Sequence, residues 1–135
     1  MIIEDQRTKL DDYADKFEFI KLRREDGILE LTVHTDGGPL RWGRMPHAEL
    51  ENAFHYIARD RDNQLVIMTG AGDEFSGPAP DPEENKAAHK MTPQEWGDLG
   101  WESKGLLTNL LAIDVPMISA VNGPALRHAE LPIMC

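Results

Sequence analysis

The most informative part of the sequence is Leu65-Val66-Ile67-Met68-Thr69-Gly70-Ala71-Gly72, which continues as Asp73-Glu74-Phe75-Ser76. Its four leading apolar residues do not alternate with polar ones, and such a run is typical of a strand buried on both faces. The Gly-x-Gly at 70–72 then indicates a tight turn. We therefore expect a buried strand over 65–70 that ends in a glycine loop.

A second unit of this kind is Val115-Pro116-Met117-Ile118-Ser119-Ala120-Val121-Asn122-Gly123-Pro124. A helix is predicted between the two units, because Thr92 fits an N-cap, Pro93 fits the first helical position and Glu95 completes a capping box. Two buried strands joined by a helix predict an α/β fold of the βαβ type. In such folds ligands bind at the loops that follow the strand ends.

The predicted helix runs from 93 to about 113. Its expected buried side chains are Trp96, Leu99, Leu106, Leu107, Leu110 and Leu111. Three glycines at 97, 100 and 105 weaken it and suggest a close approach of a neighbouring backbone. We also expect a peripheral helix within 4–16 and a hairpin of strands 17–22 and 28–34. A further helix runs from Pro46 to about Arg59, with its apolar positions at Leu50, Ala53, Phe54, Ile57 and Ala58.

Composition sets the class of protein. The 135 residues are 41% apolar and 28% charged, which predicts one globular domain over 1–135. A net charge of −10 argues against nucleic-acid binding. The single cysteine, Cys135, and the lack of a signal peptide or a run of about 20 apolar residues predict a cytoplasmic protein that does not enter membranes. The final Leu131-Pro132-Ile133-Met134-Cys135 is apolar, so we expect an incomplete domain.

The two glycine loops resemble a known family. Residues 69–76 and 115–126 are similar to the two N-terminal signatures of the crotonase (enoyl-CoA hydratase/isomerase) superfamily, and the resemblance extends over 17–135. It implies the N-terminal portion of a ββα spiral and assembly as a homotrimer or hexamer. Such a domain is much longer than this chain, so the resemblance also implies that about half of it is present.

Both loops depart from the family pattern. The usual Phe-Ser-Ala-Gly-Ala-Asp is replaced by Phe75-Ser76-Gly77-Pro78-Ala79-Pro80-Asp81, in which Ala79 takes the position of one oxyanion-hole N–H. The usual glycine triplet of the second loop is replaced by Arg127-His128-Ala129, and His128 falls on the position of the second N–H. The family uses two such backbone N–H groups to stabilise the oxyanion that forms on an acyl-CoA thioester. The departures at both positions therefore count against thioester chemistry on acyl-CoA.

A divergent branch, the β-diketone hydrolases of the 6-oxocamphor hydrolase type, resembles the chain more closely. The similar segments are Val33-His34-Thr35-Asp36-Gly37 before Trp42, His47-Ala48-Glu49-Leu50, and His128-Ala129-Glu130-Leu131-Pro132. The resemblance implies that Trp42, His47, Ala79 and His128 bind a small diketone, and that His128 and Glu130 are catalytic. It implies no cofactor and no metal, and it places the water-activating His–Asp pair beyond Cys135.

The side-chain chemistry fits a retro-Claisen cleavage of a cyclic β-diketone. Trp42 offers an N–H donor for the attacked carbonyl oxygen, and histidines exchange protons near neutral pH. Each of these residues also has an interpretation without a role in binding or catalysis: Trp42 as a loop anchor, His47 as a solvent-facing residue, and Glu130 as a surface acid. His34 is expected to be structural, and His55 and His89 solvated. The alternative functions are an enoyl-CoA hydratase/isomerase-like enzyme and an inactive fragment or interaction module.

Overall fold

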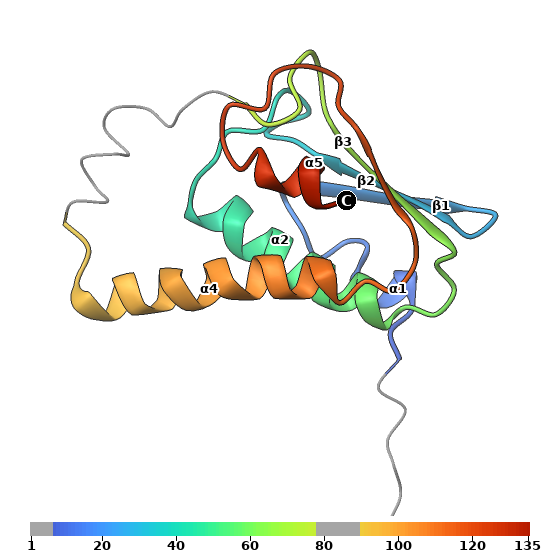
Figure 1. Cartoon of the computed structure of the whole chain (residues 1–135), viewed down its shortest axis with the longest axis horizontal. Helices are drawn as coiled ribbons and strands as arrows, with labels where there is room; N and C mark the ends of the chain where they lie inside the picture. Colours follow the sequence, from blue (N-terminus) through green and yellow to red (C-terminus); the bar gives the residue numbers. More distant parts are fainter. Residues whose placement is uncertain (1–6, 78–89) are drawn as a thin grey trace, which may run out of the picture.

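The computed structural model of the protein describes residues 7–77 and 90–135. Along the chain these residues form α1 (Leu10–Tyr13), β1 (Ile20–Glu25), β2 (Ile28–Val33), α2 (Arg44–Arg59), β3 (Leu65–Gly70), α4 (Pro93–Leu111), β4 (Met117–Ala120) and α5 (Glu130–Met134). Within the described ranges, the strands form one sheet of order β1-β2-β3-β4. Figure 1 shows α2 and α4 running along the same side of this sheet. The predicted α/β class is confirmed.

Strand direction follows from the connections. β1 and β2 are antiparallel, whereas β2, β3 and β4 are mutually parallel, with α2 and α4 as the two crossovers. The β3–α4–β4 unit is the predicted βαβ arrangement. Parallel neighbours end at the same edge of the sheet, so the loops that follow β3 and β4 emerge together.

The turn of the β1–β2 hairpin is formed by Asp26 and Gly27, which have φ of 49° and 80°. Both values are positive, as a two-residue type I′ turn requires. The predicted first strand, 17–22, was placed too early, since β1 spans Ile20–Glu25. The N–H groups of Glu18 and Phe19 donate instead to the Glu49 carboxylate. A side chain of α2 therefore replaces a strand partner at this point.

The prediction that β3 is buried on both faces was wrong. Val66, Met68 and Gly70 are buried, but the alternate residues of the strand are only half-buried. β4 alternates between half-buried and exposed residues, and its Ile118 is 50% exposed. The reason is the layering: the helices cover one face of the sheet, so the other face has no covering layer within the described residues.

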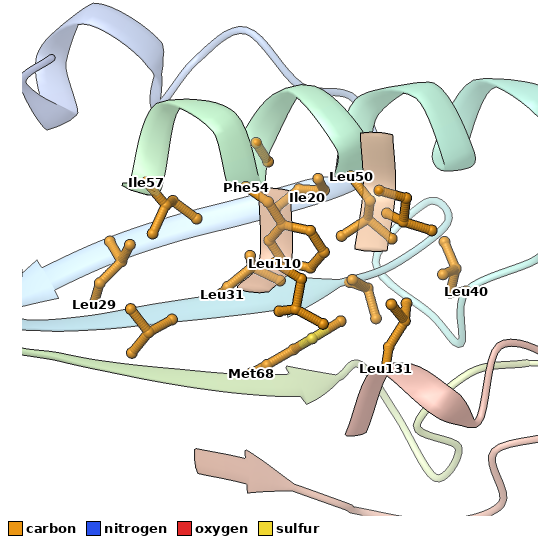
Figure 2. Packing of buried hydrophobic residues seen from close by; sticks show 14 of the residues in the cluster. Ile20, Leu29, Leu31, Leu40, Leu50, Phe54, Ile57, Met68, Leu110 and Leu131 are labelled. Carbon is orange, nitrogen blue, oxygen red and sulfur yellow. The ribbon is translucent and has the colours of Figure 1, made fainter. Parts of the chain in front are cut away.

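The core lies between α2 and the covered face of the sheet (Figure 2). Leu29, Leu31 and Val33 point to it from β2, as predicted from their alternation. The α2 side chains that meet them are Leu50, Ala53, Phe54 and Ile57, which confirms the predicted helical stripe except at Ala58, which is half-buried. Burying each large side chain of this kind contributes about 1.5–3 kcal/mol.

The predicted burial of α4 was wrong at Trp96 and Leu111, which are 51% and 68% exposed. Only Leu106 and Leu110 are fully buried, because α4 packs on α2 along one narrow stripe. The predicted capping box is confirmed: the Glu95 N–H donates to Thr92 Oγ1, and the Thr92 N–H donates to the Glu95 carboxylate.

The α4 glycines differ in what surrounds them. A methyl group at Gly105 would meet the Glu51 side chain, with its Oε1 at 2.7 Å, whereas nothing lies within 4 Å at Gly97 or Gly100. A close approach therefore occurs at one of the three glycines, and it involves a side chain. None of the described helices is long and apolar enough to cross a membrane.

A buried ion pair ties the hairpin to the turn after α2. Arg24 Nη1 donates to Asp60 Oδ2 at 2.7 Å and to Asn63 Oδ1 at 2.9 Å, and the Tyr13 hydroxyl also donates to Asp60 Oδ2. The Asp60 side chain is fully buried. Burial and the nearby carboxylate of Asp60 raise the pKa of Tyr13 far above its ordinary range. The turn after α2 is thus a polar junction in which Asp60 and Asn63 are buried.

Candidate active site

The loops that follow β3 and β4 are joined by a short parallel ladder. The Phe75 N–H donates to the Pro124 carbonyl at 3.0 Å, and the Leu126 N–H donates to the Ser76 carbonyl at 3.0 Å. Ser76 and Ala125 form the corresponding parallel bridge. The two predicted glycine loops therefore lie side by side and form one wall.

Asn122 holds the first loop in its turn. Its Oδ1 accepts from the Gly70 N–H at 3.1 Å, and its Nδ2 donates to the carbonyls of Gly72 and Glu74. The next residue, Gly123, lies so close that an added methyl group would be 1.9 Å from the Asp73 carbonyl oxygen. Sequence reasoning noted this Asn-Gly pair only as part of a motif, although asparagine side chains commonly bind turn backbones.

The second loop leads to His128, whose φ of 51° places it in the left-handed region. Few non-glycine residues adopt this conformation, and apart from turns such as the one at Asp26 it occurs at some functional sites. The backbone is fixed on both sides. Ser76 Oγ donates to the Arg127 carbonyl, and the Leu131 N–H donates to the His128 carbonyl at 3.0 Å.

Three rings from distant parts of the chain meet at this wall. The Trp42 and His128 ring centroids are 4.3 Å apart, those of His47 and His128 are 5.2 Å apart, and those of Trp42 and His47 are 6.5 Å apart. Trp42 and His47 are buried, whereas the His128 side chain is 31% exposed. The structure thus brings these three residues together, while their part in binding or catalysis stays a prediction.

Glu130 completes the cluster. The His128 Nδ1 lies 2.6 Å from Glu130 Oε1, and because a carboxylate only accepts, the ring N–H is the donor. Burial by itself would raise the pKa of Glu130. Its own backbone N–H and the His128 ring outweigh burial and lower that pKa below its ordinary value. The pairing leaves Nε2 of His128 as the ring nitrogen that is available to a ligand.

His47 occupies the first turn of α2 and is neutral near pH 7, because burial lowers its pKa and the neighbouring His128 lowers it further. Its Nε2 lies 3.5 Å from Ser103 Oγ on α4. Two buried polar atoms of the site, His47 Nδ1 and Trp42 Nε1, have no hydrogen-bond partner among residues 7–77 and 90–135. Unpaired buried groups are costly and uncommon, so these two atoms are the polar groups of the site that are left without a partner within the described residues.

The other predicted residues fall elsewhere. Ala79 lies outside the described residues, as does His89, so the first oxyanion-hole position is not placed. His34 accepts a hydrogen bond from the Gly37 N–H and has a structural role, and His55 is exposed. No group of three or more His, Cys, Asp or Glu residues in the described ranges could hold a metal ion.

Sequence reasoning missed Ser103. The residue reaches the site only because α4 packs against α2, and its place in a helix of mixed polarity carries no sequence signal. The left-handed backbone of His128 was also missed. The residue replaces a glycine of the family pattern, and that substitution was the signal that could have predicted it.

Neither a protein-family model nor a curated protein matches the sequence. Among solved structures, the chain superposes on ABDH, a β-diketone hydrolase from the cyanobacterium Anabaena sp. PCC 7120, with 42% identity and a TM-score of 0.83. The match covers 91% of this chain and 48% of that chain. The chain has the N-terminal portion of a crotonase-like fold. The predicted resemblance to the crotonase superfamily and to its β-diketone hydrolases is therefore confirmed.

More distant crotonase-like structures agree with this fold. An enoyl-CoA hydratase/isomerase from Mycobacterium paratuberculosis is 19% identical, with a TM-score of 0.70 over 80% of this chain and 43% of that chain. An enoyl-CoA hydratase/carnithine racemase from Magnetospirillum magneticum is 26% identical, with a TM-score of 0.67 over 83% of this chain and 42% of that chain. The chain spans less than half the length of these crotonase-like proteins.

Proposed function

We propose that this chain forms the substrate-binding half of a β-diketone hydrolase, which opens a cyclic β-diketone to a keto acid. The main support is the contact of Trp42 with His128, at 4.3 Å between ring centroids, with Glu130 bound to Nδ1 of the imidazole. The 42% identity with a β-diketone hydrolase supports the same reaction class.

The reaction is a retro-Claisen cleavage. Water adds to one carbonyl carbon, and the bond from that carbon to the carbon shared by both carbonyls then breaks. The electron pair of this bond leaves as an enolate of the second ketone. A proton transferred to the enolate carbon gives a ketone, and the attacked carbonyl becomes a carboxylic acid. Diketone and water are thereby converted into a keto acid without a redox step.

Trp42 supplies the fixed hydrogen-bond donor. Its indole N–H is buried and can only donate, so it selects an acceptor such as a ketone oxygen. The oxygen gains negative charge as water adds or as the enolate forms. A donor that is already in place stabilises this charge without reorganisation, which is the usual basis of oxyanion stabilisation.

His128 is the proton carrier in this proposal. With Nδ1–H donated to Glu130, its Nε2 faces the ligand and delivers the proton to the enolate carbon. The Glu130 carboxylate stabilises the imidazolium before transfer, in the manner of the acid member of a catalytic triad. The base that activates water is expected in the part of a β-diketone hydrolase that this chain does not span.

The ligand bound to ABDH has matching chemistry. That protein was solved with (S)-3-oxocyclohexyl acetic acid, a keto acid of the kind that hydrolysis of a bicyclic β-diketone yields. We propose the same class of product for this chain. Its ketone oxygen would accept from Trp42 Nε1, the buried donor that is unpaired among the described residues.

The test is a chimera in which this chain replaces the matching N-terminal part of ABDH. The chimera should open a bicyclic β-diketone to the keto acid without added coenzyme A. The His128→Ala variant of the chimera should lose activity by about tenfold or more, the lower end of acid–base catalysis. A folded chimera that hydrates enoyl-CoA thioesters and leaves the diketone intact would replace this proposal with the enoyl-CoA alternative.

A further inference from the structure

The hydroxyl proton of Ser103 is already used in a hydrogen bond within α4. Its hydroxyl donates to the Leu99 carbonyl at 2.7 Å, one turn earlier in α4. A serine hydroxyl has a single proton, so this bond leaves only lone pairs for a second partner. The second partner is His47, whose Nε2 lies 3.5 Å from the same oxygen.

We propose that Ser103 is a positioning residue that holds His47 in its Nε2–H tautomer. Since Ser103 Oγ can only accept from His47, the proton of the neutral ring belongs on Nε2 and Nδ1 keeps its lone pair. Nδ1 is buried and has no partner among the described residues. It therefore accepts a hydrogen bond from the ligand, from either a hydroxyl group or a bound water.

The helix pair keeps this geometry fixed. His47 lies on α2 and Ser103 on α4, and the two helices pack along their length. Asn109 Nδ2 donates both to the Glu51 carbonyl at 3.0 Å and to Glu51 Oε1 at 2.9 Å, which ties α4 to α2 close to the pair. The Ser103 oxygen is thus presented by a helix rather than by a mobile loop.

The consequence is a division of roles at the buried end of the site. Trp42 Nε1 is a donor and His47 Nδ1 an acceptor, so the site is complementary to a carbonyl oxygen next to an O–H group. A carbonyl with an adjacent water, or the hydrate formed from them, has this pattern. This assignment rests on the proposed function only for the identity of the ligand, because the tautomer is a property of the free chain.

The tautomer is measurable in the 135-residue chain by ¹⁵N NMR of the histidine rings, with His47→Gln used to assign the signals. Above the His47 pKa, we expect a protonated, pyrrole-type Nε2 and a bare, pyridine-type Nδ1. In Ser103→Ala the two ¹⁵N shifts should move toward each other as the tautomers mix. Ser103→Thr keeps the hydroxyl and should restore the wild-type pattern.

Two results would overturn the proposal: a pyrrole-type Nδ1 in the wild-type chain, or an unchanged pattern in a folded Ser103→Ala variant. Backbone amide spectra establish that each variant is folded. The readout does not depend on turnover. If the chain has the Nε2–H tautomer but the ABDH chimera does not hydrolyse the diketone, the proposed function is rejected and the Ser103 assignment is retained. If the chimera is active but the chain has the Nδ1–H tautomer, the Ser103 assignment is rejected and the proposed function is retained.

Discussion

His128 Nδ1 and Glu130 Oε1 lie 2.6 Å apart, although only one residue separates them in the chain. The contact depends on the left-handed backbone of His128, which turns the chain so that both side chains reach the same space. A carboxylate bound to Nδ1 fixes the orientation of the imidazole and leaves Nε2 as the free ring nitrogen. The reactivity proposed for the site therefore depends on a carboxylate at residue 130.

Glu130→Gln tests this dependence. In the ABDH chimera the variant should lower kcat by about tenfold or more while changing KM little, because the amide cannot stabilise the imidazolium. Glu25→Gln, an exposed change on the hairpin, is the matched control and should leave both constants unaltered. Equal kinetics for Glu130→Gln and wild type would make Glu130 a surface acid.

Trp42→Phe removes the indole N–H and keeps an aromatic ring. The wild-type chain titrated with (S)-3-oxocyclohexyl acetic acid should show a shifted Trp42 Nε1–H resonance. The variant should bind about tenfold more weakly, consistent with the loss of one buried hydrogen bond. Trp101→Phe, which alters a tryptophan that is 75% exposed, should bind as wild type does. Identical affinities for the two variants would mean that Trp42 only anchors its loop.

The buried His47 should make stability depend on pH. Burial lowers its pKa in the folded chain below the ordinary value of 6.5, so the unfolded chain takes up the proton first as pH falls. Stability should therefore decrease below pH 6.5, by at most about 1.4 kcal/mol per pH unit for one proton. Urea unfolding at several pH values measures this slope.

His47→Gln should reduce the slope. Part of it should remain, because burial also lowers the pKa of His34. His55→Gln changes an exposed histidine of the same helix and should leave the slope as it is. A slope that is the same in all three proteins would contradict the burial of a neutral imidazole at 47.

Gly123→Ala tests the close approach of the two loops. The new methyl group would lie 1.9 Å from the Asp73 carbonyl oxygen, so the backbone must move, and we expect a loss of about 1–3 kcal/mol in the free energy of unfolding. Gly97→Ala meets no atom within 4 Å and lies within α4, so it should stabilise the chain by up to about 1 kcal/mol. Chemical denaturation compares the two, and an unchanged Gly123→Ala variant would argue against the ladder between the loops.

Asp60→Ala should be strongly destabilising. It removes the buried carboxylate that pairs with Arg24, and breaking a buried pair in this way costs up to about 3–5 kcal/mol. Asp62→Ala removes a carboxylate whose side chain is 48% exposed, so it should destabilise the chain much less than Asp60→Ala does. Thermal and urea unfolding would rank the two variants, and equal effects would show that the Asp60 pair adds little.

The sequence predicted the structural features that depend on local residue patterns. Alternation located the buried face of β2, the 3.6-residue period located the α2 stripe, and Thr92 with Glu95 located the start of α4. The predictions of burial failed where tertiary packing determines which side chains are buried. Nothing local distinguishes the buried Leu106 from the exposed Leu111, because the difference lies in which side of α4 meets α2.

The candidate site divides in the same way. Trp42, His47 and His128 were selected through a family resemblance, and their convergence required the fold. Ser103 had no local signal at all, since its role comes from the packing of α4 against α2. Glu130 was noted as a possible acid, but its pairing with His128 depends on a backbone angle that the sequence alone did not predict.

The bonds of Asn122 also have a kinetic consequence. They join residues about fifty positions apart, and Asn109 is linked to Glu51 over a similar separation. Contacts of such high sequence separation form slowly, because the entropy of closing a long loop must be overcome before they contribute. We expect the β1–β2 hairpin to assemble early and the wall that carries His128 late. Fluorescence of Trp42, which contacts that wall, should accordingly report the final step of folding.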